Sequence, residues 1–281
     1  MQTITKIHKV AAFTMDGQGG NPAGVMIRAA MPDEQAMQRI AAELGYSETV
    51  FAAPAGDGWR VRYFSPEGEV AFCGHATIAL GAVLAQQNGD GIFSLITNHA
   101  RVTVESKVDG DSVSAALQSP PTTSSAAPSM LVDGALALFG YSRADLDERI
   151  PPALANGGAD HLVLALASRE RLRAMRYELD AGRELMRAHG LATIALVHAE
   201  TAQRFHARNP FASGGVYEDP ATGAAAAALG GYLRDLGWPH GGHIDIVQGE
   251  DMGLPCHLQV TIGQQAGGSM RVSGTTRMLA D

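Results

Sequence analysis

The sequence predicts an α+β protein of two similar halves, each with strands around one buried central helix. In residues 64–84 an extended run turns through Gly74 into a long apolar helix. In residues 214–237 a similar Gly- and Ala-rich helix follows a similar strand, turn and strand. Three short antiparallel strands are expected to wrap the first helix, at residues 92–97, 100–105 and 112–117.

Short identical segments relate the two central helices, at unequal offsets. Ala76-Thr77 matches Ala221-Thr222 at an offset of 145 residues, and Ala79-Leu80-Gly81 matches Ala228-Leu229-Gly230 at 149. The difference predicts about one extra turn in the second helix. A chance match between two Ala-rich helices is the alternative.

A Pro-, Ser- and Thr-rich stretch marks the expected domain boundary. Its sequence, SPPTTSSAAPSM, offers few side chains to bury. We therefore predict an N-terminal domain over 1–118, a linker over 119–130 and a C-terminal domain over 131–268. The final strand, 269–281, is a candidate to return to the first domain.

Composition narrows the functional classes. The chain has 281 residues, of which 46% are hydrophobic, and a net charge of −8, so it can bury real cores but gives nucleic acid or an anionic membrane little to bind. Two cysteines are too few for a secreted disulfide framework. With no signal-peptide pattern at the N-terminus and no apolar run of about 18 residues, a reducing cytoplasm is the expected location.

The start of the first central helix concentrates polar chemistry. Cys73, Gly74, His75, Ala76 and Thr77 supply a thiol, an imidazole, a hydroxyl and backbone N–H groups within one turn. Because the helix dipole favours an anion at this end, a small carboxylate-bearing molecule is the expected ligand.

Two carboxylates occupy comparable positions. Glu48 opens an apolar strand; it is either a solvent-facing end residue or, inside a cleft, a general acid/base with a pKa raised by burial. Asp219 stands beside the second helix start, where an Asp is often an N-cap. If the two halves face each other, both helix starts meet across one cleft.

Neither a metal nor a nucleotide cofactor is indicated by the motifs. His240 and His243 lack a nearby third ligand, and adjacent Cys256 and His257 would point apart on a strand. GQGGNPAG lacks the dinucleotide-binding glycine pattern, and Ser47 has no nucleophile-elbow context. Cofactor-free proton transfer on a small anion remains.

Five motifs together resemble the PhzF, or phenazine-biosynthesis-like, family, in the family's order along nearly the whole chain. They are GGNPAGV (19–25), YSETVF (46–51), RYFSPEGEVAFCGHATIA (62–79), YEDPATGA (217–224) and QGEDMG (248–253). The resemblance implies the diaminopimelate epimerase-like fold, with two pseudo-symmetric domains, each an antiparallel sheet or barrel rolled around a central helix. It also implies an active site between the domains and a homodimer.

By the same resemblance, Glu48 is the proton-transferring glutamate, assisted by His75 and Asp219. The residues expected to bind substrate are Asn21, Ser47, Cys73, Gly74, Ala76, Thr77, Thr222, Gly223 and Ala224. The expected reaction is a cofactor-independent isomerisation of a small carboxylate metabolite.

Two departures leave alternatives open. Ala224 stands where the family usually has serine, which puts the phenazine precursor in doubt as substrate and leaves room for a non-catalytic binding protein. Cys73 opens the second alternative, an amino-acid racemase or epimerase. Such enzymes use one thiol from each half, whereas the second half here offers Asp219 near the matching place.

Overall fold

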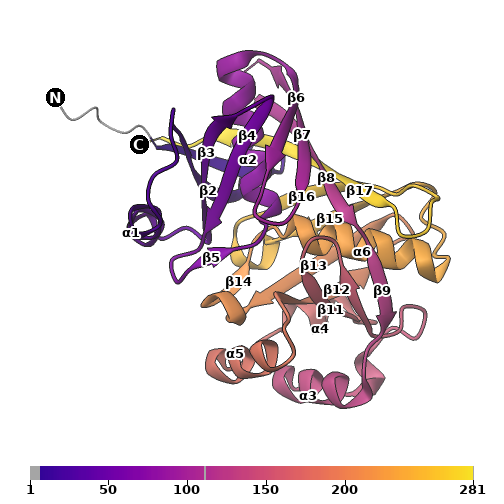
Figure 1. The fold of residues 1–281 in the computed structure, drawn as a ribbon. Helices are drawn as coiled ribbons and strands as arrows, with labels where there is room; N and C mark the ends of the chain where they lie inside the picture. Colours follow the sequence, from indigo (N-terminus) through magenta and orange to yellow (C-terminus); the bar gives the residue numbers. More distant parts are fainter. Residues whose placement is uncertain (1–6, 111, 281) are drawn as a thin grey trace. The chain divides into compact units, whose positions relative to one another are not determined.

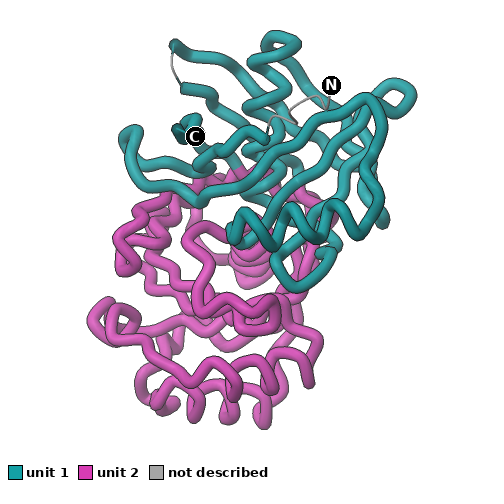
Figure 2. Tube along the Cα trace, turned by 90° about the vertical axis from the view of Figure 1, so that its left-hand side faces the viewer, with its two compact units in different colours: residues 1–118, 273–281 teal, residues 119–272 magenta. Residues whose placement is uncertain are grey.

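The computed structural model describes residues 7–110 and 112–280 (Figure 1). It divides into two compact units (Figure 2): unit 1 comprises residues 1–118 and 273–281, and unit 2 comprises residues 119–272. The chain leaves unit 1 within strand β8 (Ser112–Pro121) and returns to it within strand β17 (Ser269–Met278).

Unit 1 is a mixed sheet that surrounds helix α2 (Gly74–Asn88). The pairs β1–β2, β3–β4, β6–β7 and β7–β8 are antiparallel, and the pairs β2–β3 and β4–β6 are parallel. Strand β17 pairs with β1 and with β8, so the sheet closes on itself. The other elements of unit 1 are β1 (His8–Thr14), β2 (Asn21–Ile27), α1 (Glu34–Leu44), β3 (Glu48–Ala55), β4 (Gly58–Phe64), β5 (Glu69–Val70), β6 (Gly91–Ile96) and β7 (Arg101–Asp109).

Helix α2 is buried on every side, because its first twelve residues are small or apolar apart from His75 and Thr77. Gly81 shows how closely the sheet approaches: a Cβ there would lie 2.5 Å from the Val104 side chain of β7. This close packing fixes the N-terminal end of α2 inside the unit.

Unit 2 repeats this topology around helix α6 (Gly223–Leu236). Antiparallel β10–β11, parallel β11–β12, antiparallel β12–β13, parallel β13–β15 and antiparallel β15–β16 follow the same order as β1 to β7. The strands are β9 (Thr123–Ala126), β10 (Ala153–Asn156), β11 (Asp160–Ala165), β12 (Thr193–Ala199), β13 (Arg204–Phe211), β14 (Val216–Asp219), β15 (His243–Gln248) and β16 (Cys256–Thr261). Both units therefore have the predicted diaminopimelate epimerase-like fold.

A helical layer on the outer face distinguishes unit 2. Helices α3 (Ser129–Phe139) and α5 (Leu179–Ala188) lie on the opposite side of the strands from α6 (Figure 1). With α4 (Arg169–Arg173) they bury an apolar cluster that includes Phe139 and Met186. Two hydrophobic layers on one sheet stabilise this unit on both faces.

A buried ion pair also lies on this outer face. Arg208 of β13 and Glu218 of β14 are 5% and 4% exposed, and two guanidinium nitrogens contact the two carboxylate oxygens at 2.9 and 2.5 Å. Arg208 also donates to the carbonyl oxygen of Arg173 at 2.9 Å. The pair thus ties two strands to the end of α4.

Two expectations differ from the structure. Residues 119–126 of the expected linker end β8 and form β9, which pairs with β10, and α3 begins at Ser129. Polar Ser and Thr side chains suit such a strand, because backbone hydrogen bonds rather than side-chain burial hold it. The expected extra turn is also wrong: α2 has 15 residues and α6 has 14.

Gly157, between β10 and β11, meets the backbone of α6. A Cβ there would lie 2.6 Å from the backbone nitrogen of Ala228 and 2.8 Å from the carbonyl oxygen of Ala224. We expect Gly157→Ala to lower the free energy of unfolding by about 1–3 kcal/mol, because backbone cannot yield as a side chain can. Urea unfolding measures the change.

Gly134→Ala in α3 is the matched control. There the nearest atom to a new Cβ, on Leu185, lies at an ordinary 3.5 Å. Alanine in a helix interior should stabilise by about 0.5–1 kcal/mol. Equal effects of the two substitutions would contradict the close approach at Gly157.

Candidate active site

Three predicted residues come together inside unit 1. Glu48 opens β3, beside Ala23 of β2, while Cys73 and His75 begin α2. Their exposed fractions are 5%, 6% and 2%. An apolar strand and a buried helix thus carry a carboxylate, a thiol and an imidazole into the interior.

The His75 imidazole links the other groups. Its Nε2 lies 3.5 Å from a carboxylate oxygen of Glu48 and 3.4 Å from the hydroxyl of Ser47. Its Nδ1 lies 3.3 Å from the Cys73 sulfur. Glu48 is therefore not the solvent-facing strand end that the sequence left open.

Burial lowers the pKa of His75 to about 3, so the imidazole is neutral at physiological pH. A neutral imidazole has one donor and one acceptor nitrogen. When Glu48 is ionised, Nε2–H faces its carboxylate, and Nδ1 is left to accept from the Cys73 thiol. The three side chains then lie in a row, from the Cys73 thiol through the imidazole to the Glu48 carboxylate, with each donor facing an acceptor.

Other predicted substrate-binding residues lie around this group. Asn21 begins β2, 1% exposed, two residues before the strand partner of Glu48. Gly74 and Ala76 form the first turn of α2. The hydroxyl of Thr77 donates to the carbonyl oxygen of Cys73 at 2.7 Å and lies 2.7 Å from the Tyr63 hydroxyl, so it braces the helix start.

In unit 2, Asp219 and Thr222 form a second polar group with Gln248. The Thr222 hydroxyl donates to an Asp219 carboxylate oxygen at 2.7 Å. The Gln248 amide donates to the Asp219 carbonyl oxygen at 2.7 Å and to the Thr222 hydroxyl at 3.0 Å, and it accepts from the Thr222 backbone N–H at 3.2 Å. Gln248 thereby fixes the turn that leads through Gly223 and Ala224 into α6.

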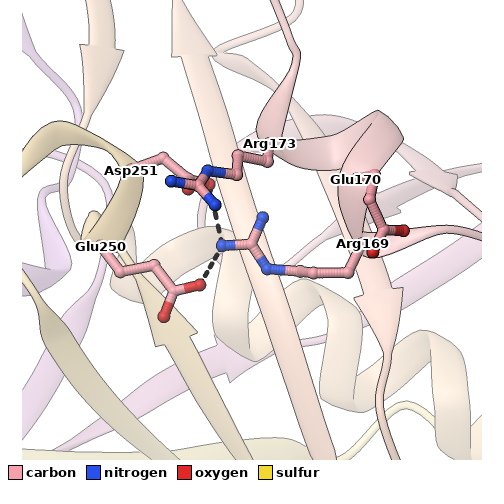
Figure 3. A pocket seen from close by; sticks show the side chains of 5 residues that line it. All are labelled: Arg169, Glu170, Arg173, Glu250 and Asp251. Atoms are coloured by element: carbon pink, nitrogen blue, oxygen red, sulfur yellow. Dashed lines mark hydrogen bonds and ion pairs between the residues drawn. The ribbon is translucent and has the colours of Figure 1, made fainter.

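Sequence reasoning missed Gln248 as a site residue, although its motif QGEDMG was noticed. The next turn of that motif is anchored by Arg169, which contacts Glu250 and lies 3.0 Å from Asp251 (Figure 3). These side chains, with Glu170 and Arg173, line a surface cavity of about 400 Å³. The sequence signal for Gln248 is an amide side chain at the end of the strand-like run HIDIVQ.

The common topology shows which positions of the two units correspond. Both central helices start at a Gly preceded by their N-cap, Cys73 in unit 1 and Thr222 in unit 2, at an offset of 149 residues. The offset of 145 that aligned Thr77 with Thr222 is therefore not the structural one. The thiol of unit 1 corresponds to a hydroxyl in unit 2.

By the same comparison, Thr193 of unit 2 is the position equivalent to Glu48 of unit 1. Each is the first residue of the strand that runs parallel to its neighbour, Glu48 beside Ala23 and Thr193 beside His161. The Thr193 hydroxyl lies 2.8 Å from His161 Nδ1 and donates to Asn209 at 3.0 Å. Unit 2 thus has hydroxyls where unit 1 has its carboxylate and thiol, and it has Asp219 instead of Val70.

Metal-ligand types cluster at one place in the described ranges. Glu48, Cys73 and His75 each offer a ligand atom, and these atoms lie within 4.8 Å of one another. Elsewhere, His257 bonds Asp245 at 2.9 Å and His240 accepts from the Gly242 N–H at 2.9 Å.

The two buried histidines predict a pH dependence of stability. Burial lowers the pKa of His75 to about 3 and that of His161 to about 4. Below pH about 6.5 the unfolded chain binds protons that the folded chain does not. The free energy of unfolding should therefore fall as pH falls from about 6.5 toward 4. Each of the two histidines contributes about 1.4 kcal/mol per pH unit in the range where it is protonated in the unfolded chain and neutral in the folded one.

Urea unfolding between pH 7.5 and 5 measures this slope, above the range where most carboxylates titrate. His161→Gln should reduce the slope, since the pKa of His161 is lowered in the folded protein along with those of His75 and His240. A stability that stays constant across this range would contradict the neutral state of both imidazoles.

None of the helices within residues 7–110 and 112–280 is long and apolar enough to cross a membrane.

Comparison with known proteins identifies relatives over nearly the whole chain. The model of the PhzC-PhzF family, described as phenazine biosynthesis-like protein, matches residues 10–281. A Deinococcus radiodurans protein named uncharacterized isomerase is 34% identical over 269 residues, covering 92% of this chain and 87% of its own length.

Solved structures agree with this. A predicted epimerase from Pseudomonas aeruginosa has a TM-score of 0.87 at 25% identity, and a Bacillus anthracis phenazine biosynthesis protein of the PhzF family has a TM-score of 0.82 at 21%. Each comparison covers 98% of this chain and 97% of the other.

Proposed function

Because the chain belongs to the phenazine biosynthesis-like (PhzC-PhzF) family and is an isomerase, we propose that Glu48 moves a proton between two carbons of a small carboxylate-bearing substrate. The reaction needs no cofactor in this proposal. Transfer between carbons, rather than inversion of one carbon, is its central point.

The observation that carries the proposal is the one-sided placement of acid/base groups. Unit 1 has a buried carboxylate beside a neutral imidazole, whereas the corresponding positions in unit 2 are the hydroxyls of Thr193 and Thr222. Inverting a carbon requires a base and an acid on opposite faces of the substrate. Asp219, the carboxylate of unit 2, already accepts from the Thr222 hydroxyl at 2.7 Å. We therefore assign removal of the proton, and its return on the same face, to Glu48 alone.

The proposed reaction has two balanced steps. The Glu48 carboxylate takes a proton from an acidic C–H bond, and the bonding electron pair is delocalised into the adjacent conjugated system of the substrate. The protonated Glu48, whose carboxyl proton exchanges with solvent, then protonates a second carbon, where the delocalised electron pair forms the new C–H bond. General acid/base catalysis of this kind contributes about 10²–10⁴-fold.

The surrounding groups bind and orient. The backbone N–H groups at the start of α2 suit a substrate carboxylate, since that end of a helix favours negative charge. His75, neutral at 2% exposure, can hydrogen-bond the substrate or Glu48 without adding charge. We propose that Asp219, held by Thr222 and Gln248, assists the same reaction.

There are two wider proposals: the low cysteine content supports a cytoplasmic location, and the family resemblance supports a homodimer. Sedimentation of the purified chain at micromolar concentration tests the second. A single species of 29.4 kDa would contradict it.

Proton exchange in D₂O tests the reaction. Cyclic and amino-carboxylate metabolites are incubated with wild-type protein and followed by NMR. We expect deuterium to enter one compound with the wild type and with Cys73→Ala, but not with Glu48→Gln.

Exchange that survives Glu48→Gln and is lost in Cys73→Ala would contradict the proposal and favour the thiol racemase. The observation behind that alternative is the 3.3 Å contact between the Cys73 sulfur and His75. If Asp219→Asn keeps full exchange, the assisting role of Asp219 is wrong while the Glu48 step stands.

A further inference from the structure

The Glu48, His75 and Cys73 side chains together offer three metal-ligand atoms. The proposed proton transfer does not need all three of them. One carboxylate oxygen, one imidazole nitrogen and one sulfur lie within 4.8 Å of one another. All three residues are at least nine-tenths buried. We propose that this group is a binding site for zinc and similar divalent cations, with Cys73 bound as thiolate.

The separations fit a tetrahedral ion after small side-chain movements. Zinc binds sulfur at about 2.3 Å and nitrogen or oxygen at about 2.0–2.2 Å, so its tetrahedral ligands lie about 3.4–3.6 Å apart. Nε2 of His75 is 3.5 Å from the Glu48 carboxylate and 4.0 Å from the Cys73 sulfur. The Glu48 carboxylate and the Cys73 sulfur lie within 4.8 Å of each other. Side-chain rotations that bring the sulfur and the carboxylate oxygen closer together, by about 1 Å at most, complete the geometry.

The chemistry of the donors selects the metal class. A thiolate, an imidazole and a carboxylate together suit zinc, whereas magnesium and calcium prefer oxygen ligands alone. Three protein ligands leave a fourth position open to water or to a substrate carboxylate. Binding displaces the thiol proton of Cys73, so it strengthens as pH rises.

The expected consequence is inhibition. A cation held by Glu48 occupies the carboxylate that would accept a proton. The metal site can be tested separately from the isomerase reaction, because spectroscopy detects the bound ion itself.

Cobalt titration of the reduced, metal-free protein is the primary test, because a thiolate bound to Co²⁺ gives a charge-transfer absorption. We expect one equivalent of Co²⁺ to bind, the band to be absent in Cys73→Ser, and the affinity to fall at least tenfold in Glu48→Gln. Zinc should displace the cobalt and abolish the band.

Two matched variants serve as controls. Cys256→Ser removes the other buried thiol, which donates to the carbonyl oxygen of Leu254, and Glu43→Gln neutralises an exposed carboxylate on α1. Both should bind cobalt like the wild type.

X-ray absorption of the zinc-loaded wild type provides a readout that needs no variant. One sulfur at about 2.3 Å, with nitrogen and oxygen ligands at about 2.0–2.2 Å, is expected. A zinc shell without sulfur, a cobalt band that persists in Cys73→Ser or disappears in Cys256→Ser, or the absence of binding to the folded wild type would each overturn the proposal.

Discussion

Glu48→Gln is expected to slow turnover by about 10²–10⁴-fold while the protein still folds and binds its substrate. Glutamine nearly matches the size of glutamate but cannot accept the substrate proton. Since Glu48 is only 5% exposed, removing its charge relieves a desolvation cost, and stability should not fall sharply. Initial rates of deuterium exchange, with the melting temperature as a folding check, measure both effects.

Glu43→Gln is the matched control for the same chemical change on the exposed face of α1. Its exchange rate should equal that of the wild type. Turnover by Glu48→Gln within threefold of the wild type would show that another group removes the proton, and His75→Asn would then be the next variant to measure.

Arg208→Met is expected to cost the protein about 3–5 kcal/mol, because it leaves the Glu218 carboxylate buried without its partner. Both residues are at most 5% exposed, and their contacts at 2.9 and 2.5 Å are bidentate. Thermal and urea unfolding measure the loss.

The double variant Arg208→Met with Glu218→Leu should recover most of that stability, since it removes both charges and keeps similar volume. A surface pair supplies the comparison. Arg143 and Asp133 lie 2.7 Å apart with side chains 56% and 60% exposed, so Arg143→Met should cost less than about 1 kcal/mol. Similar losses in Arg143→Met and Arg208→Met would contradict the importance of burial.

Local patterns predicted the elements that bear the site. The apolar run after Gly74 gave α2, and the Ala-rich run after Thr222 gave α6, because a helix buried on all sides needs small and apolar residues throughout. Glu48 was noticed because a carboxylate at the start of an apolar strand is unusual. Its 3.5 Å approach to His75 depends on strand pairing, which residue periodicity does not reveal.

The correspondence between the halves was harder to read. Identical dipeptides aligned Thr77 with Thr222, but the helix starts align Cys73 with Thr222. A short match in an Ala-rich segment carries little information, whereas the order of parallel and antiparallel strands fixes the alignment. Gln248 was missed for a related reason: its partners Asp219 and Thr222 are distant in sequence.

The path of the chain through the two units also sets an order of assembly on the ribosome. Strand β1 pairs with β17, with Val10 opposite Met278, so the unit that begins first in the sequence is completed last. Translation of residues 119–272, which make up all of unit 2, takes roughly 8–30 s at bacterial and eukaryotic elongation speeds. During that interval the nascent first unit lacks its closing strand, exposing one edge of β1 and one of β8. Unit 2, whose residues are contiguous, can fold earlier, and emergence of β17 from the ribosome then lets the first barrel close.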